Sequence, residues 1–136
     1  MKEKFKFLSH TGDIKFRAYG KTLEDTFNNC ALAISSIFSR GKKIKPLIIK
    51  NFSIEGKDNE SLIYKLIEEL IYFFDAENFI VSKTEVKIDN LKANITVYGD
   101  KTSNYLDLDA IKSPTYAEMY IKKKVNLWEA QIVVDV

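Results

Sequence analysis

Hydrophobic and polar residues follow two different periods in the first forty positions. Residues 13–20 (DIKFRAYG) alternate apolar with polar side chains, which predicts a strand with one buried face, and the apolar residues of 5–8 predict a shorter strand before it. Across residues 23–38 the apolar positions recur every three or four residues, which predicts an amphipathic helix. Thr22 is suited to cap its first turn, and Gly41 to form a left-handed C-terminal cap.

The rest of the chain predicts one more helix among several strands. Residues 62–74 carry the widest apolar stripe, so this second helix, capped near Asp58-Asn59, is expected to be the most buried element. Asp89-Asn90 is expected to form a two-residue hairpin turn, because both residues tolerate positive φ. The remaining strands are predicted at residues 52–55, 81–88, 91–97, 116–122 and 128–136.

This order, β-β-α-β-α-β-β-β-β, is typical of the α+β class. We therefore expect residues 1–136 to form one domain with a two-layer fold, a mostly antiparallel sheet and two main helices. Two β-α-β-like stretches suggest an internal duplication, but the similarity in their spacing is too weak to establish it.

Composition narrows the classes of function. The net charge is only +2, and Arg17 and Arg40 are the only arginines, which argues against a strongly basic RNA binder. The lone cysteine, Cys30, falls on the apolar stripe of the first helix, where a core position is expected, and it suits a reducing, cytoplasmic setting. The N-terminal residues resemble no signal peptide, and charges interrupt the apolar stretch 62–74, so no membrane association is expected.

The least ordinary chemistry lies at the two ends of the sequence. His10-Thr11-Gly12-Asp13 precedes a predicted strand, and Asp135 is followed by the α-carboxylate of Val136. If the first and last strands are neighbours, these oxygens would suit a hard cation such as Ca²⁺ or Mg²⁺. On spacing alone, the simpler interpretation is favoured, in which Asp13 caps a turn and Asp135 is a solvated terminal charge.

Other candidate groups carry weaker signals. His10 is the only histidine, and a lone histidine is more often a structural residue in a turn than a catalyst. The basic clusters at 40–43 and 122–124 could serve solubility, or could dock RNA or an acidic protein without sequence specificity. Neither G-x-G-x-x-G nor the P-loop motif occurs.

Several of these segments together resemble the archease family. The family pattern H-T-[AG]-D-I, followed by a strand and G-x-[ST]-L-E-E, is similar to His10–Ile14 and Gly20–Asp25 here. Further matches are Leu70–Asp75, Ile111–Tyr116 and the terminal Val133-Val134-Asp135-Val136. The resemblance covers nearly the whole chain, in order and with matching spacing.

This resemblance implies a function. Archeases are non-catalytic partners of the GTP-dependent RNA ligase that splices tRNA. The resemblance implies that this protein promotes guanylylation of the ligase, its multiple turnover and its use of other nucleoside triphosphates, and that it meets tRNA indirectly through the ligase.

The resemblance also implies a divalent metal site, usually described as binding Ca²⁺. Its ligands would be Asp13, Asp135 and main-chain oxygens of Val136. His10, Thr11 and Lys112 would support the site or face the ligase.

One position departs from the family pattern. Family members commonly carry His after Thr-Tyr, where this chain has Ala117. Any contribution of that histidine to the site or the partner surface would be missing here.

Two alternatives remain open at this stage. The chain could be an independent RNA-binding or chaperone-like module acting on tRNA, which would bind tRNA without the ligase and with strong salt dependence. It could also be a stand-alone metal hydrolase, for which His10 is the only candidate base of its kind.

Overall fold

The computed structural model describes residues 3–9 and 12–136. The predicted order of strands and helices is confirmed within these ranges. The elements are β1 (Phe5–Leu8), β2 (Ile14–Gly20), α1 (Leu23–Ser39), β3 (Ile48–Glu55), α2 (Asn59–Glu77), β4 (Phe79–Asp89), β5 (Lys92–Lys101), the short 3-10 helix η1 (Thr102–Asn104), β6 (Ser113–Lys123) and β7 (Trp128–Asp135).

Helix α1 begins and ends with local caps that the sequence encodes. The backbone N–H of Asp25 donates to Thr22 Oγ1 at 3.0 Å, which satisfies one of the free amides of the first turn. At the other end the left-handed turn predicted at Gly41 starts one residue earlier, because Arg40 has φ 56° and Gly41 has φ 83°. The amide of Gly41 then donates to the carbonyl of Ser36 at 2.9 Å and closes the helix.

Helix α2 is longer than predicted but starts at the expected cap. Asp58 Oδ1 accepts from the amide of Ser61 at 2.7 Å, and Ser61 Oγ accepts in return from the amide of Asp58 at 3.2 Å, which is a capping box. Burial confirms the wide apolar stripe, whose core members on this helix are Leu62, Ile63, Leu66, Ile67, Leu70, Ile71 and Phe73.

The strands form two antiparallel sheets rather than one. The first has the order β1-β2-β7-β6 and the second β3-β5-β4. Strand β7 lies inside the first sheet and pairs with β2 from Ile14↔Val134 to Gly20↔Trp128. The chain therefore brings its first and last segments together in one sheet.

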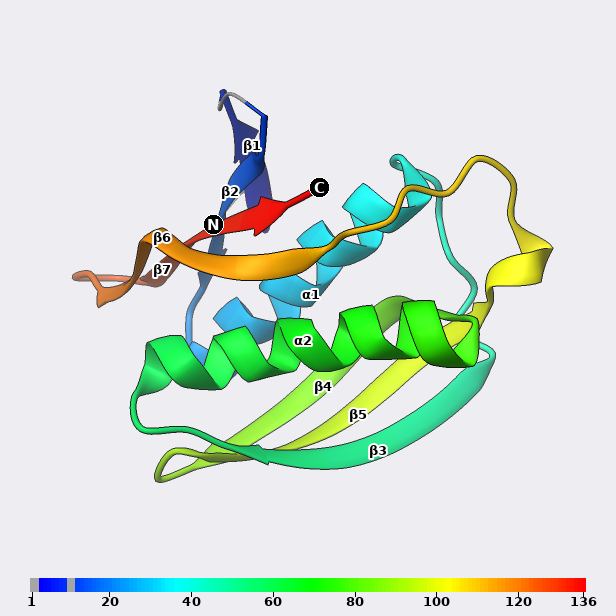
Figure 1. Ribbon diagram of the computed structural model, residues 1–136. Coiled ribbons are helices and arrows are strands. Elements are labelled where there is room, and N and C mark those ends of the chain that lie inside the picture. The colour runs from blue at the N-terminus through cyan, green and yellow to red at the C-terminus, as the bar shows by residue number, and fades with distance from the viewer. Residues whose placement is uncertain (1–2, 10–11) are drawn as a thin grey trace.

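Both helices pack between the two sheets. Helix α1 contacts β1, β2 and β7 on one side and β4 on the other, and α2 contacts β6 as well as β3 and β4. Figure 1 shows the helices in the middle of the molecule, with the second sheet below them. The α+β class is confirmed, and the core is one cluster of apolar side chains in which Phe16, Phe27 and Phe38 are fully buried.

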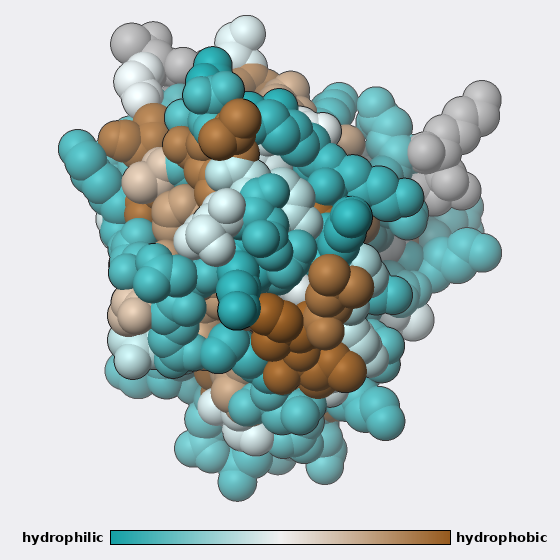
Figure 2. Space-filling model, turned by 90° about the vertical axis from the view of Figure 1, so that its right-hand side faces the viewer, coloured by the Kyte–Doolittle hydropathy of each residue, from teal (hydrophilic) through white to brown (hydrophobic). Residues whose placement is uncertain are grey.

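Some large apolar side chains stay outside this core. Leu47, Ile49 and Leu106 are 67%, 58% and 79% exposed. They belong to segments that lie side by side, because the amide of Leu47 bonds to the carbonyl of Gly99 and Lys42 bonds to the carbonyl of Leu106. Figure 2 faces the end of the molecule where β3 begins and shows an apolar patch on a mostly polar surface. Within the described ranges, neither helix is long and apolar enough to cross a membrane.

Two local expectations were wrong. The hairpin turn between β4 and β5 is Asn90-Leu91, with φ 48° and 66°, because Asp89 still pairs with Lys92. Strand β6 begins at Ser113 rather than Tyr116 and includes Pro114, a residue that normally argues against a strand. Strand β6 lies at the edge of its sheet, where proline is tolerated.

Gly99 provides a test of the second sheet. A Cβ at this position would overlap the carbonyl oxygen of Ile80 and the ring of Phe79. We expect Gly99→Ala to lower the free energy of unfolding by about 1–3 kcal/mol, because neither neighbour can move without disturbing the core. Urea denaturation measures this, with exposed Lys92→Ala as the control that changes stability by less than about 0.5 kcal/mol. Equal stability of the two variants would contradict the close approach.

Candidate metal centre

The candidate metal ligands lie where the ends of three strands meet. Ile14 pairs with Val134, so continuing the antiparallel register by one residue sets Asp13 opposite Asp135. On the other edge of β7, Asp135 pairs with Ser113 of β6. The two aspartates that are 122 positions apart in sequence are thus neighbours in the fold, and we call this place the acidic corner (Asp13, Asp135 and Val136).

Backbone bonding fixes the acidic corner without using its carboxylates. The amide of Lys112 donates to the carbonyl oxygen of Asp135 at 2.8 Å, which holds the end of β7 against the start of β6. Within the described ranges, neither the Asp13 nor the Asp135 carboxylate has a hydrogen bond or an ion pair. No described residue therefore neutralises either carboxylate, and two like charges opposite each other on paired strands repel unless a cation lies between them.

The exposure of these residues permits binding from outside. Asp13 and Asp135 are half-buried, Lys112 is exposed, and Val136 is 38% exposed. His10 and Thr11, the other candidates from the sequence, lie outside the described residues. Among the residues described, no three His, Cys, Asp or Glu side chains gather as a complete metal site. The donors present are two carboxylates and main-chain oxygens, and this all-oxygen set fits a hard cation rather than zinc.

A groove runs from Asp13 toward the end of α1. Its volume is about 540 Å³, and its walls include Phe7, Ile37 and Asp13. Arg40 and Asp109 also line it, and Arg40 Nε lies 3.6 Å from Asp109 Oδ2. Asp13 therefore lines a groove that has both apolar and charged walls.

Beyond the acidic corner, the outer face of the first sheet carries a polar network that the sequence did not predict. Arg17 Nε donates to Gln131 Oε1 at 3.0 Å, and Gln131 Nε2 donates to the carbonyl of Glu118 at 2.7 Å. Glu118 has φ 56° and lies in the irregular part of β6 between Thr115 and Tyr120. Alternation in β7 predicts that Gln131 faces solvent, yet it is 6% exposed.

The network continues to Glu129, which is 7% exposed. Tyr120 Oη donates to Glu129 Oε2 at 2.6 Å, and Lys124 Nζ lies 3.0 Å from Glu129 Oε1. Burial alone would raise the pKa of Glu129, but the bonds from Tyr120 and Lys124 outweigh it and lower that pKa. Burial and the bond to Glu129 raise the pKa of Tyr120 to about 12. The network therefore stabilises the charged carboxylate and the neutral phenol.

Cys30 is excluded as a nucleophile. It is fully buried in α1, and burial raises the pKa of its thiol. A thiol that stays protonated inside the core is inert, so its predicted core role is confirmed.

The Glu129 cluster predicts a pH-dependent loss of stability. Because the folded-state pKa of Glu129 is lowered, its charge stabilises the fold above the ordinary value of 4.5, and this contribution disappears as pH falls through the lowered pKa. We expect Glu129→Gln to cost about 1–3 kcal/mol at pH 7. The difference from wild type should shrink below pH 4.5. Urea denaturation across this range measures it, and a difference that stays constant with pH would contradict the assigned charge.

Known proteins match this chain along almost all of its length. The family described as Archease protein family (MTH1598/TM1083) matches residues 5–136. Protein archease of Sulfurisphaera tokodaii is 35% identical over 140 residues, covering 98% of this chain and 99% of the relative. Protein archease of Methanosarcina barkeri is 32% identical over 143 residues, covering 98% and 97%.

A solved structure shares the fold as well. The solution structure of Methanobacterium thermoautotrophicum protein 1598 has a TM-score of 0.84 and 30% identity, and the match covers 98% of this chain and 99% of that one. The agreement extends over both sheets and both helices. From family match, relatives and fold together, we conclude that the chain belongs to the archease family.

Proposed function

We propose that this protein is an accessory activator of a GTP-dependent tRNA-splicing RNA ligase. In this role it promotes guanylylation of the ligase, so that the ligase turns over repeatedly and accepts other nucleoside triphosphates. Membership of the archease family supports an accessory role. The protein meets tRNA through the ligase, acts in the cytoplasm and needs no membrane.

The observation that carries this proposal is the pairing of Ile14 with Val134, because continuing this register by one residue sets Asp13 opposite Asp135. Their carboxylates have no partner among the described residues, both aspartates are half-buried, and Asp13 lines a groove. Two adjacent unneutralised carboxylates are costly unless a cation joins them. The arrangement therefore favours a site made to hold a cation and to present it outward.

Asp13, Asp135 and main-chain oxygens of Val136 would hold this divalent ion, for which Ca²⁺ is the best candidate because every donor is oxygen. A bound divalent ion supplies positive charge that can neutralise phosphate oxygens during nucleotide transfer. Residues of the chain would position this ion. The Lys112 amide holds the carbonyl of Asp135, and the pairing of β7 with β2 brings the Asp135 carboxylate toward Asp13. The exposed Lys112 side chain adds a cation that can face the ligase or its nucleotide.

The proposal assigns the chemistry of nucleotide transfer to the ligase. This protein contributes the acidic corner and its docking surface, and no residue of its own becomes guanylylated. His10 and Thr11, which directly precede Gly12-Asp13 in sequence, are assigned a supporting or ligase-facing role.

Substituting the aspartates tests the role in activation. We expect Asp13→Asn and Asp135→Asn each to reduce stimulation of ligase guanylylation at least about tenfold, because each removes a ligand charge at nearly constant size. The measurement is the yield of ligase–GMP formed from labelled GTP at limiting activator and fixed Ca²⁺. Asp89→Asn, exposed at the end of β4, is the matched control and should activate fully. Full activation by both corner variants would contradict the proposal.

Stability measurements test the acidic corner without the ligase. In a chelator we expect Asp13→Asn to be up to about 1 kcal/mol more stable than wild type, because it relieves repulsion across the strand pair. With Ca²⁺ at 100 times its dissociation constant, wild type should gain about 2.7 kcal/mol, and Asp13→Asn far less at the same concentration. Urea denaturation in the two buffers gives both values. Equal responses of the two proteins to Ca²⁺ would place the ion elsewhere.

A further inference from the structure

The end of the β6–β7 hairpin combines lysines with aromatic rings. Lys122, Lys123 and Lys124 follow one another at the end of β6, and the amide of Lys124 donates to the carbonyl of Leu127 at 2.7 Å to close the turn. Residues 119–128 (MYIKKKVNLW) contain these three cations and no carboxylate. We call residues 120–128 the lysine hairpin.

Each of the first two lysines lies beside a ring. Lys122 Nζ lies 4.3 Å from the centre of the Tyr120 ring, and Lys123 Nζ lies 5.9 Å from that of Trp128. Because neighbouring residues of a strand point to opposite faces, these two pairs occupy opposite faces of the hairpin. The lysine hairpin therefore presents a cation and an aromatic surface on both sides.

The third lysine has a structural role instead. Lys124 is bound to Glu129 at 3.0 Å and helps to stabilise that buried carboxylate. Next to it, Val125 is 96% exposed and contributes an apolar side chain at the tip. The charges available to a partner are therefore those of Lys122 and Lys123, both exposed.

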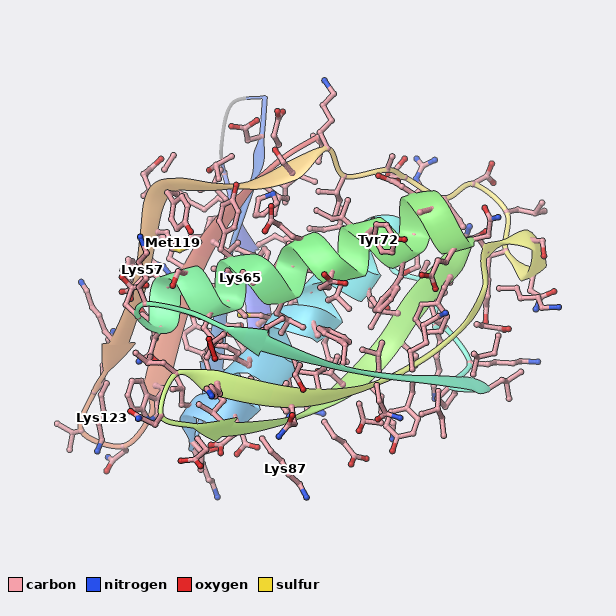
Figure 3. All side chains as sticks on the ribbon, turned by 60° about the horizontal axis from the view of Figure 1, so that its bottom comes forward. Lys57, Lys65, Tyr72, Lys87, Met119 and Lys123 are labelled. Carbon is pink, nitrogen blue, oxygen red and sulfur yellow. The ribbon has the colours of Figure 1, made fainter. Side chains whose placement is uncertain are left out.

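The lysine hairpin also projects from the body of the molecule. Figure 1 shows the β6–β7 turn extending beyond the N-terminal end of α2. Figure 3 shows Lys123 at the same end of the molecule as Lys57, which precedes α2. Trp128 and Asp135 begin and end β7, so the hairpin lies about 23 Å along the strand from the acidic corner. The two surfaces are far enough apart to bind different molecules at once.

From these observations we propose that the lysine hairpin binds single-stranded RNA directly. Ammonium groups of Lys122 and Lys123 contact phosphates, and the rings of Tyr120 and Trp128 offer surfaces for bases. Paired cations and aromatic rings are how proteins bind single strands without reading their sequence. This contact goes beyond the proposed function, in which tRNA is met only through the ligase.

Other polyanionic partners fit the hairpin less well. An anionic membrane would require more exposed apolar surface than Val125 provides at the tip of the hairpin. An acidic peptide would use the lysines but would not need the exposed parts of the two rings. RNA uses both.

Trp128 gives a local readout of this contact, because it is the only tryptophan in the chain. We expect a short unstructured single-stranded RNA, added to the purified full chain at low salt, to quench Trp128 fluorescence. The logarithm of the binding constant should fall linearly with the logarithm of salt concentration. In Lys122→Gln/Lys123→Gln the slope should shrink by about 1.4, since each phosphate contact on a single strand contributes about 0.7.

Matched controls decide whether the hairpin is responsible. Lys42→Gln/Lys43→Gln removes the same charge from the other basic cluster and should keep the wild-type slope and quenching. The proposal is overturned if no RNA binding is seen at low salt, or if both double variants lose affinity equally. It is also overturned if polyglutamate or phosphatidylserine vesicles perturb Trp128 as strongly as RNA does.

Ligase guanylylation measured without RNA distinguishes RNA binding by the hairpin from activation of the ligase. Lys122→Gln/Lys123→Gln should still stimulate ligase guanylylation in the absence of RNA, because the hairpin is remote from the acidic corner. Loss of that stimulation in a folded variant would show that the hairpin docks the ligase, and would overturn the assignment of RNA to it.

Discussion

The pairing of β7 along both of its edges is the constraint on which the rest of the structure depends. Its inward side chains Ala130, Ile132 and Val134 are fully buried, and its outward side chains Glu129 and Gln131 hold the polar network. A slip of one residue would exchange these faces and expose the apolar set. The same register sets Asp135 beside Asp13 and Ser113, so the core fixes the candidate site.

Local signals in the sequence were enough to predict the helices and strands, but not to predict which strands share a sheet. The helix stripes, the caps at Thr22 and Asp58 and the alternation of the strands depend on neighbouring residues, and these predictions are confirmed. Two sheets with the helices between them follow from contacts between distant segments, which periodicity does not record. Leu91 adopts positive φ because the pairing of Asp89 with Lys92 leaves a two-residue turn.

The candidate site was only partly accessible from sequence for the same reason. Spacing alone made a metal site at Asp13 and Asp135 one interpretation among simpler ones. The resemblance to the archease family indicated these two residues as metal ligands. The β2–β7 register now supplies a physical reason for their proximity. The buried positions of Glu129 and Gln131 could not have been predicted, because their partners Arg17, Tyr120 and the carbonyl of Glu118 come from two other strands. In sequence they are simply the polar half of an alternating strand.

In the proposed site, Asp13 and Asp135 together hold a divalent ion. Anomalous diffraction from crystals grown with Mn²⁺, which takes oxygen ligands and scatters anomalously, locates such an ion directly. We expect one strong peak between the two carboxylates, within about 2.0–2.6 Å of their oxygens. The peak should disappear in Asp135→Asn crystals of the same form. A peak only elsewhere, or none at the acidic corner at saturating Mn²⁺, would rule out this metal site.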